Sequence, residues 1–160
     1  MAITFDATVA GTATNSYVTV AEADDYFSIY IYATGQSEWP SGSATATVTQ
    51  KENYLMAATR TIDNQLFINE KYTEEQALQF PRYMQDGNTE DVDVIPQAIK
   101  NAVFEEALGI INGCGSTAQC DGVTSERMGS TAVTYGFKRR KTISAKAWEY
   151  LRDWLKRRND

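Results

Sequence analysis

The chain has 160 residues, of which 42% are hydrophobic and 11% aromatic, which is enough to bury one ordinary core but not two. It contains no histidine, which removes the commonest general base, the usual zinc ligand and the Ser-His and Cys-His pairs of most hydrolases. We therefore expect one domain, 1–160, that is not an enzyme. Residues 1–137 hold 6 Lys/Arg against 18 Asp/Glu, and residues 138–160 hold 9 Lys/Arg against 3 Asp/Glu. The domain thus has an acidic body and a basic end.

Two capping boxes predict where the first helices begin. In this motif a threonine side chain accepts from the N–H three residues on, and a glutamate reaches back to the cap N–H. The motif occurs at Thr19–Glu22 and again at Thr49–Glu52. The elements predicted before the centre of the chain are an extended arm over 1–15, helices over about 20–32 and 50–64, and a short helical piece near 73–78.

Residues 95–112 are predicted to contain the central helix of the fold. Pro96 suits the first helical position because its missing N–H would be unpaired there, and Gly113 suits the stop because glycine tolerates a left-handed backbone. Apolar residues cover most faces of this segment, so other elements must surround it. The fold class is therefore mainly α, a single-domain helical bundle around a helix over about 96–112.

Two further elements are predicted after the central helix. Residues 123–135 alternate in the manner of two strands that turn near Gly129, so we expect a β-hairpin. Ser144 can cap a C-terminal amphipathic helix in which apolar and basic residues alternate. The predicted apolar positions of that helix are Ala147, Trp148, Leu151, Trp154 and Leu155.

The candidates for metal binding or acid–base chemistry are weak. The acidic loop from Asp86 places oxygen ligands as a calcium loop does, but it lacks the turn glycine and the final glutamate. Cys114 and Cys120 are too few ligands for zinc, and a cytosolic setting favours free thiols over a local disulfide. The adjacent Glu105 and Glu106 point to different sides of a helix and are expected to be surface charge. We therefore predict no metal ion and no cofactor.

The basic C-terminal segment, residues 138–160, combines nine cations with two tryptophans. It can dock against an acidic protein, it can pair with the phosphates and stack on the bases of nucleic acid, or it can be a solvated helix end. The residues leave these alternatives open, with protein docking preferred. The candidate docking residues are Lys138, Arg139, Arg140, Lys141, Trp148, Arg152, Trp154, Lys156, Arg157 and Arg158.

A structural ion pair is predicted beside the central helix. The proline of Phe80-Pro81-Arg82 fixes the direction of the chain. Arg82 is then expected to reach the carboxylate of Glu105, and Arg60 is the competing cation.

Three blocks of the sequence carry a resemblance to a known family. The blocks are Asn15–Phe27, Ala57–Asp63 followed by Gln76–Arg82, and Ile95–Ala107. They resemble a family of tailed-phage head–tail connector proteins of the adaptor or head-completion type, which often carry the label DnaT-like single-stranded DNA-binding protein. Residues 125–135 are also similar to the family's hairpin, and the predicted last helix falls where the family ends.

This resemblance implies a structural protein of the phage neck that forms a homo-oligomeric ring, expected to be twelvefold, on the portal protein. It would join the DNA-filled head to a downstream tail or stopper protein, in the virion and, during assembly, in the host cytoplasm. DNA would pass through the channel without specific binding, and no membrane is involved. The family label implies the alternative, a single-stranded-DNA-binding protein. The acidic body favours the connector, because sequence-independent single-strand binders normally present a basic groove.

Overall fold

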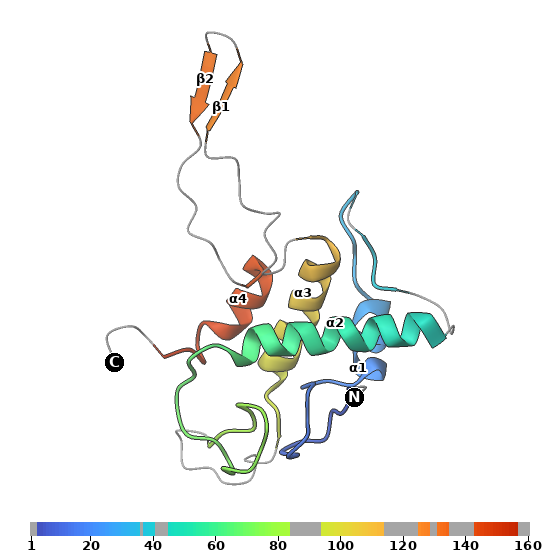
Figure 1. Cartoon of the computed structure of the whole chain (residues 1–160), viewed down its shortest axis with the longest axis vertical. Helices are drawn as coiled ribbons and strands as arrows, with labels where there is room; N and C mark the ends of the chain where they lie inside the picture. Colours follow the sequence, from blue (N-terminus) through green and yellow to red (C-terminus); the bar gives the residue numbers. More distant parts are fainter. Residues whose placement is uncertain are drawn as a thin grey trace.

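The fold is mainly α, as predicted. In the computed structural model, residues 3–35, 37–40, 45–83, 94–113, 125–128, 131–134 and 143–156 are described. Helices α1 and α4 lie to either side of α3, and the long helix α2 crosses in front of α3 (Figure 1). The elements are α1 (Val20–Ser28), α2 (Thr45–Asp63), α3 (Gln97–Ile111), β1 (Ser125–Met128), β2 (Thr131–Thr134) and α4 (Ala145–Leu151).

Helix α3 is the centre of the core, and its prediction is confirmed. Its first residue is Gln97, and Pro96 is the N-cap, so the helix begins one residue later than predicted. Gly113 has a φ of 71°, the left-handed value expected after a helix end. Eight residues of this helix, between Ile99 and Leu108, are buried. Helix α3 packs chiefly against α4 and α2.

Helix α1 begins at the predicted capping box and ends earlier than predicted. Thr19 accepts from the N–H of Glu22 at 3.2 Å, and Glu22 accepts from the N–H of Thr19 at 2.7 Å. The helix was predicted to continue to residue 32, but it ends at Ser28. After Ser28, exposed and packed side chains alternate from one residue to the next. Ile29 and Ile31 are 85% and 93% exposed, whereas Tyr30 and Tyr32 pack against the core, as in an extended chain.

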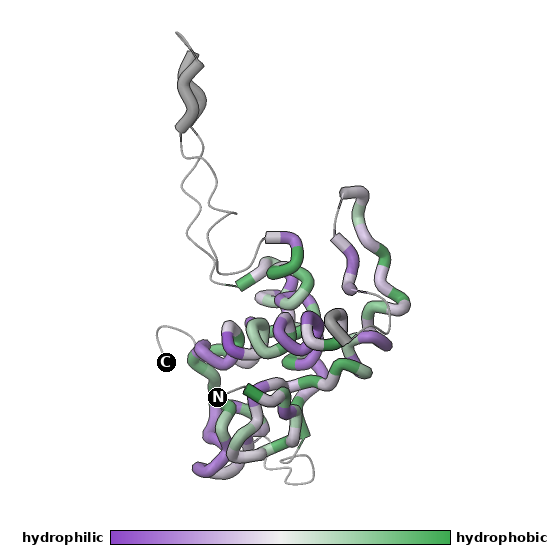
Figure 2. Tube along the Cα trace, turned by 45° about the vertical axis from the view of Figure 1, so that its right-hand side comes forward, coloured by the Kyte–Doolittle hydropathy of each residue, from purple (hydrophilic) through white to green (hydrophobic). Residues whose placement is uncertain are grey.

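Helix α2 starts one turn before the second capping box. Its first residue is Thr45, so Thr49 lies inside the helix and the predicted start near residue 50 is wrong. The residues added, Thr-Ala-Thr-Val, contain no helix breaker that would prevent the extra turn. Hydrophobic and hydrophilic residues alternate along this helix (Figure 2), and Leu55, Ala58 and Ile62 are fully buried on one face.

Residues 65–83 form an irregular loop, so the short helix predicted near 73–78 is wrong. The buried Gln76 side chain makes hydrogen bonds to backbone groups of this loop, in place of the backbone–backbone bonds that a helix would make. Its Oε1 accepts from the N–H of Thr73 at 3.1 Å, and its Nε2 donates to the carbonyls of Leu78 at 2.8 Å and Pro81 at 3.1 Å. The Phe80–Pro81 peptide bond in this loop is cis.

The N-terminal residues fold back on themselves, which corrects the extended arm predicted over 1–15. The backbone N–H groups of Asn15 and Ser16 donate to the carbonyl of Asp6 at 2.9 and 3.0 Å. The Asn15 side chain accepts from the N–H of Asp6 at 2.9 Å and donates to the carbonyl of Thr4 at 2.7 Å. A single asparagine thus closes the loop.

Strands β1 and β2 pair in antiparallel fashion, with Ser125 opposite Thr134 and Met128 opposite Thr131. The turn predicted at Gly129 lies outside the described residues, as do the acidic loop from Asp86 and the segment from Cys114 to Cys120.

Candidate functional site

Helix α4 and the residues after it hold the described part of the basic C-terminal segment. The Ser144 side chain caps α4 by accepting from the N–H of Ala147 at 3.3 Å, and Ala147 and Leu151 are buried against α3. Trp148, which was predicted both as an apolar position of this helix and as a docking candidate, is 41% exposed. The Arg152 side chain is 68% exposed, and its Nε lies 3.6 Å from the carboxylate of Asp153. The N–H of Arg152 donates to the carbonyl of Trp148, so the two stand on consecutive turns.

The chain after α4 is fixed to the 65–83 loop. The N–H of Ile68 donates to the carbonyl of Trp154 at 3.0 Å, and the N–H of Lys156 donates to the carbonyl of Leu66 at 2.9 Å. The Trp154 ring meets the Phe80 ring edge-on at 5.8 Å. Trp154 is therefore a packing residue, whereas Lys156 is exposed. The candidates Lys138, Arg139, Arg140, Lys141, Arg157 and Arg158 lie outside the described residues.

Glu105 joins three helices, and its partner is not the predicted one. Its carboxylate, only 6% exposed, accepts from the Tyr26 hydroxyl at 2.8 Å and from the Tyr30 hydroxyl at 3.2 Å. Its cation is Lys146 of α4, whose Nζ lies 3.9 Å from it. Lys146 also donates to the Tyr30 hydroxyl, which raises the pKa of the ammonium. Burial and then the Glu105 carboxylate raise the pKa of Tyr26.

Arg82 makes no ion pair with Glu105, so that prediction is wrong. Its Nε donates to the carbonyl of Ile68 at 2.9 Å, one Nη to the Gln79 side chain at 2.8 Å, and the other Nη to the carbonyl of Asn69. Burial lowers the pKa of this guanidinium. Arg82 thus organises its own loop. Arg60, the competing cation, is exposed, and no ion pair of the described residues includes it.

Glu106 holds the start of α4. Its side chain is fully buried, and Oε2 accepts from the N–H of Ser144 at 2.7 Å. The other oxygen, Oε1, has no hydrogen-bond partner among the described residues. Burial raises the pKa of this carboxyl above its usual 4.5, against the lowering effect of the bonds from Ser144. Glu105 and Glu106 are therefore not the surface charges that the sequence analysis expected.

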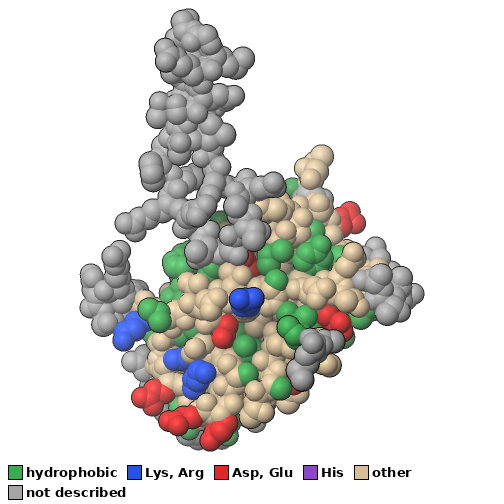
Figure 3. All heavy atoms as spheres, viewed as in Figure 1, with side chains coloured by type: hydrophobic (Ala, Val, Ile, Leu, Met, Phe, Trp, Pro, Cys, Tyr) green, Lys and Arg blue, Asp and Glu red, His purple; other side chains and the backbone are tan. Residues whose placement is uncertain are grey.

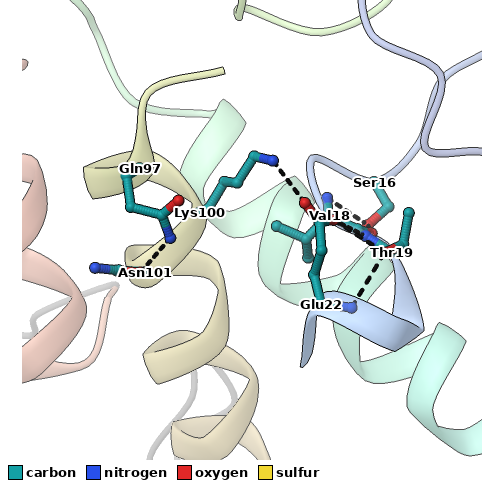
Figure 4. Close-up of polar contacts among 7 residues, drawn as sticks. All are labelled: Ser16, Val18, Thr19, Glu22, Gln97, Lys100 and Asn101. Carbon is teal, nitrogen blue, oxygen red and sulfur yellow. Dashed lines mark hydrogen bonds and ion pairs between the residues drawn. The ribbon is translucent and has the colours of Figure 1, made fainter. Parts of the chain in front are cut away.

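Lys51 of α2 and Lys100 of α3 are also paired with carboxylates. Lys51 lies 2.8 Å from Asp24, which also accepts from the Trp39 indole at 2.7 Å. Lys100 of α3 reaches across to Glu22 of α1 at 2.6 Å (Figure 4). Burial acts to raise the pKa of Glu22, but the bonds from Lys100 and Thr19 outweigh it and lower the pKa. These cations stabilise contacts between helices.

A shallow pocket lies next to the Glu22–Lys100 pair, between α1 and α3. Its volume is about 220 Å³. The rings of Tyr26 and Phe104, which stack with centroids 4.6 Å apart, form part of its wall. Polar groups of both signs surround these rings. The lining residues are Glu22, Asp25, Tyr26, Gln97, Lys100 and Phe104.

Charged groups are spread thinly over the helical body. On the face shown in Figure 3, the Lys and Arg side chains are few and separated, and they form no basic patch over the described helices. Among the described residues, no group of three or more carboxylate or thiol side chains could hold a metal ion. No helix within the described ranges is long and apolar enough to span a bilayer.

The sequence analysis missed the burial of Glu105 and Glu106 and the ion pair between Lys146 and Glu105. One signal could have found the first two, because a helix that is apolar on most faces must bury any carboxylate that it carries. Their partners could not be found locally, since Tyr26 and Ser144 lie 79 and 38 residues away.

Comparison with known proteins identifies the family. Residues 1–159 match the family described as "Putative DnaT-like ssDNA binding protein", so the chain belongs to that family. Searches of curated proteins and of solved structures found no match. The match covers the blocks from which the resemblance was drawn, and it agrees with the label that the resemblance carries. It gives no support to the head–tail connector role.

Proposed function

We propose that the chain binds single-stranded DNA and that the contact is made by the basic C-terminal segment, residues 138–160. The observation that carries this proposal, together with the family, is the exposed α4 face, which we define as Trp148 and Arg152; the exposed Lys156 follows the end of the helix. This face places a 41% exposed indole one turn from the guanidinium of Arg152, whose side chain is 68% exposed and pairs at 3.6 Å with the exposed Asp153. Aromatic platforms beside cations are the means by which sequence-independent proteins hold single strands.

The helical body is expected to take little part in this contact. Lys51 and Lys100 are engaged by carboxylates, and Arg82 is engaged by carbonyl groups. An acidic body repels DNA phosphates, so the affinity has to come from the C-terminal segment and should fall steeply as salt is raised. In this role the chain acts by binding and not by catalysis.

Fluorescence anisotropy with labelled oligo-dT over a salt series tests the proposal. Trp148→Ala should cost about 1–3 kcal/mol of binding free energy if one base stacks there, and Trp148→Phe should keep most of it. The double change Arg152→Ala and Lys156→Ala should reduce the salt slope by about 1.4. Matched controls are Tyr83→Ala, an exposed aromatic of the 65–83 loop, and Arg60→Ala, an exposed cation of α2. Equal losses in variant and control would refute the proposal.

A second function, that of a tailed-phage head–tail connector, is favoured by a different observation. Large apolar side chains protrude from the body at separate places, among them Ile29, Ile31 and Leu66, which is 78% exposed. Such residues suit contacts with proteins better than contacts with phosphates. In this role the chain would form a ring on the portal protein at the virion neck, bind a tail or stopper protein on the other side, and let DNA pass.

Co-sedimentation with the portal protein, followed by negative-stain imaging, tests the connector role. Replacing Arg152, Lys156, Arg157 and Arg158 by glutamate should weaken attachment while circular dichroism stays unchanged, and salt should weaken the wild-type attachment. No attachment by the wild type would refute it. Tight, salt-sensitive oligo-dT binding in the same preparation would favour the first function.

A further inference from the structure

The side chain of Asn112 joins the end of α3 to the segment that follows α1 (Figure 1). Its Oδ1 accepts from the N–H of Ser37 at 2.7 Å, and its Nδ2 donates to the carbonyl of Ser37 at 3.3 Å. Nδ2 also donates to the carbonyl of Leu108, near the end of the helix, at 2.9 Å. A single carboxamide thus pairs with both backbone groups of a residue 75 positions away in the sequence and also caps α3.

The residue after Asn112 makes this carboxamide chemically reactive. Asn112-Gly113 is the only Asn-Gly pair in the sequence. Because glycine has no side chain, its backbone nitrogen can approach the carboxamide carbon of the preceding asparagine without steric hindrance. Asn112 is the C-cap of α3, and Gly113 follows it with a φ of 71°. The pair therefore lies at a helix end, where local opening costs least.

We propose that Asn112 is a site of spontaneous deamidation in the folded protein and that its contact with Ser37 sets the rate. The Gly113 nitrogen gives up its proton to hydroxide and forms a bond to Cγ of Asn112. The bond between Cγ and Nδ2 breaks, and the amide nitrogen takes up a proton and leaves as ammonia, so that a cyclic succinimide remains. Water then opens this ring at either carbonyl, and the chain carries aspartate or β-linked isoaspartate at this position.

The folded geometry slows this reaction. The N–H of Gly113 donates to the carbonyl of Ile110 at 3.1 Å, and three hydrogen bonds to Ser37 and Leu108 hold the carboxamide in place. The end of α3 therefore has to open before the Gly113 nitrogen can reach Cγ. Loss of these bonds should make the reaction faster by about tenfold or more in the unfolded chain.

The product cannot restore the original contact. A carboxylate only accepts hydrogen bonds, so it withdraws the donor that the amide gave to the carbonyls of Ser37 and Leu108. It also places a negative charge at the negative end of the α3 dipole. Deamidation should thus loosen the segment around Ser37 permanently. The change stays local, because Trp39 of the same segment keeps its 2.7 Å indole bond to Asp24. This inference does not depend on the proposed DNA binding.

Mass spectrometry of the digested full chain, after incubation at mildly alkaline pH, measures the reaction. The peptide that contains Asn112 should gain the mass that separates a carboxylic acid from an amide, and isoaspartate should form together with aspartate. Asn101 lies in the same helix but precedes alanine, so it is the internal control and should stay unchanged over the same period. The same incubation in guanidinium chloride that unfolds the chain should speed the conversion of Asn112 by about tenfold or more.

Hydrogen exchange measures the structural consequence. Asn112→Asp reproduces one product and should speed exchange of the Ser37 amide. Asn101→Asp makes the same charge change at a side chain whose partner, Gln97, lies in its own helix, so it should leave that exchange unchanged. Circular dichroism verifies that both variants fold. The inference is overturned if Asn112 does not convert before every other asparagine of the folded chain, if unfolding leaves its rate unchanged, or if Asn112→Asp leaves exchange at Ser37 unchanged.

Discussion

Replacing Glu106 by glutamine removes a buried ionisable group and keeps the acceptor for the N–H of Ser144. Replacing it by leucine removes both. Because the Ser144 bond is 2.7 Å long and its acceptor is fully buried, the leucine variant leaves a donor unpaired, which costs about 1–3 kcal/mol relative to the glutamine variant. For a chain of this size, each kcal/mol lowers the melting temperature by about 2–4 °C. We therefore expect the order of stability at pH 7 to be glutamine above leucine.

The comparison of wild type with Glu106→Gln has a predicted pH dependence. Burial raises the pKa of Glu106 in the folded state, so the folded protein holds this proton more tightly than the unfolded chain does. The stability from this group is complete below the usual pKa of 4.5 and is lost as pH rises through the higher folded pKa. Glutamine has no such loss. The free energy of unfolding of the glutamine variant, measured with urea, should therefore exceed the wild-type value by an amount that grows above pH 4.5 and then levels off.

A difference that shrinks with rising pH would refute this account of Glu106, because it would mean that the folded protein prefers the ionised carboxylate. Glu38→Gln, which changes an exposed glutamate of the 37–40 segment, is the matched control and should show little pH-dependent difference.

Three further predictions concern stability. Tyr26→Phe removes the hydroxyl that donates to Glu105 and should cost about 1.5–3 kcal/mol in urea unfolding, because the bond is to a charged acceptor; a cost under half a kcal/mol would contradict this. Arg82→Lys keeps the charge but cannot reach Ile68, Asn69 and Gln79 together, so the melting temperature should fall, whereas Arg60→Lys should leave it unchanged. Adding chelator should leave the melting temperature at its buffer-control value, and a clear drop would reveal a bound metal ion.

Local signals predicted the elements whose ends are fixed by neighbouring residues. The capping box at Thr19 and the pair Pro96 and Gly113 each act within a few positions, so the starts of α1 and α3 and the end of α3 follow from the sequence. The same kind of signal failed at Thr49, because a favourable cap does not stop a helix that already began one turn earlier.

Long-range partners could not be predicted because the sequence does not say which side chains meet. Arg82 was assigned to a carboxylate on charge alone, but the loop offers it three oxygen acceptors that no pattern marks. Gln76 likewise overrides a helical pattern through bonds that depend on the folded path of residues 73–81. Of the candidate docking residues, Trp148 is exposed because Ala147 and Leu151 form the buried side of α4, whereas Trp154 is half-buried because it packs on Phe80.

The pairing of Trp154 and Lys156 with Leu66 and Ile68 determines how tension on the chain end enters the molecule. A partner that pulls on the last residues first loads these two backbone hydrogen bonds, and only then the Trp154–Phe80 contact and the core. The loop that receives this load is itself held by Arg82, whose bonds to Ile68 and Asn69 lie next to the same backbone. The C-terminal end is thus coupled to the 65–83 loop and can transmit a pull from a bound partner without first unwinding α4.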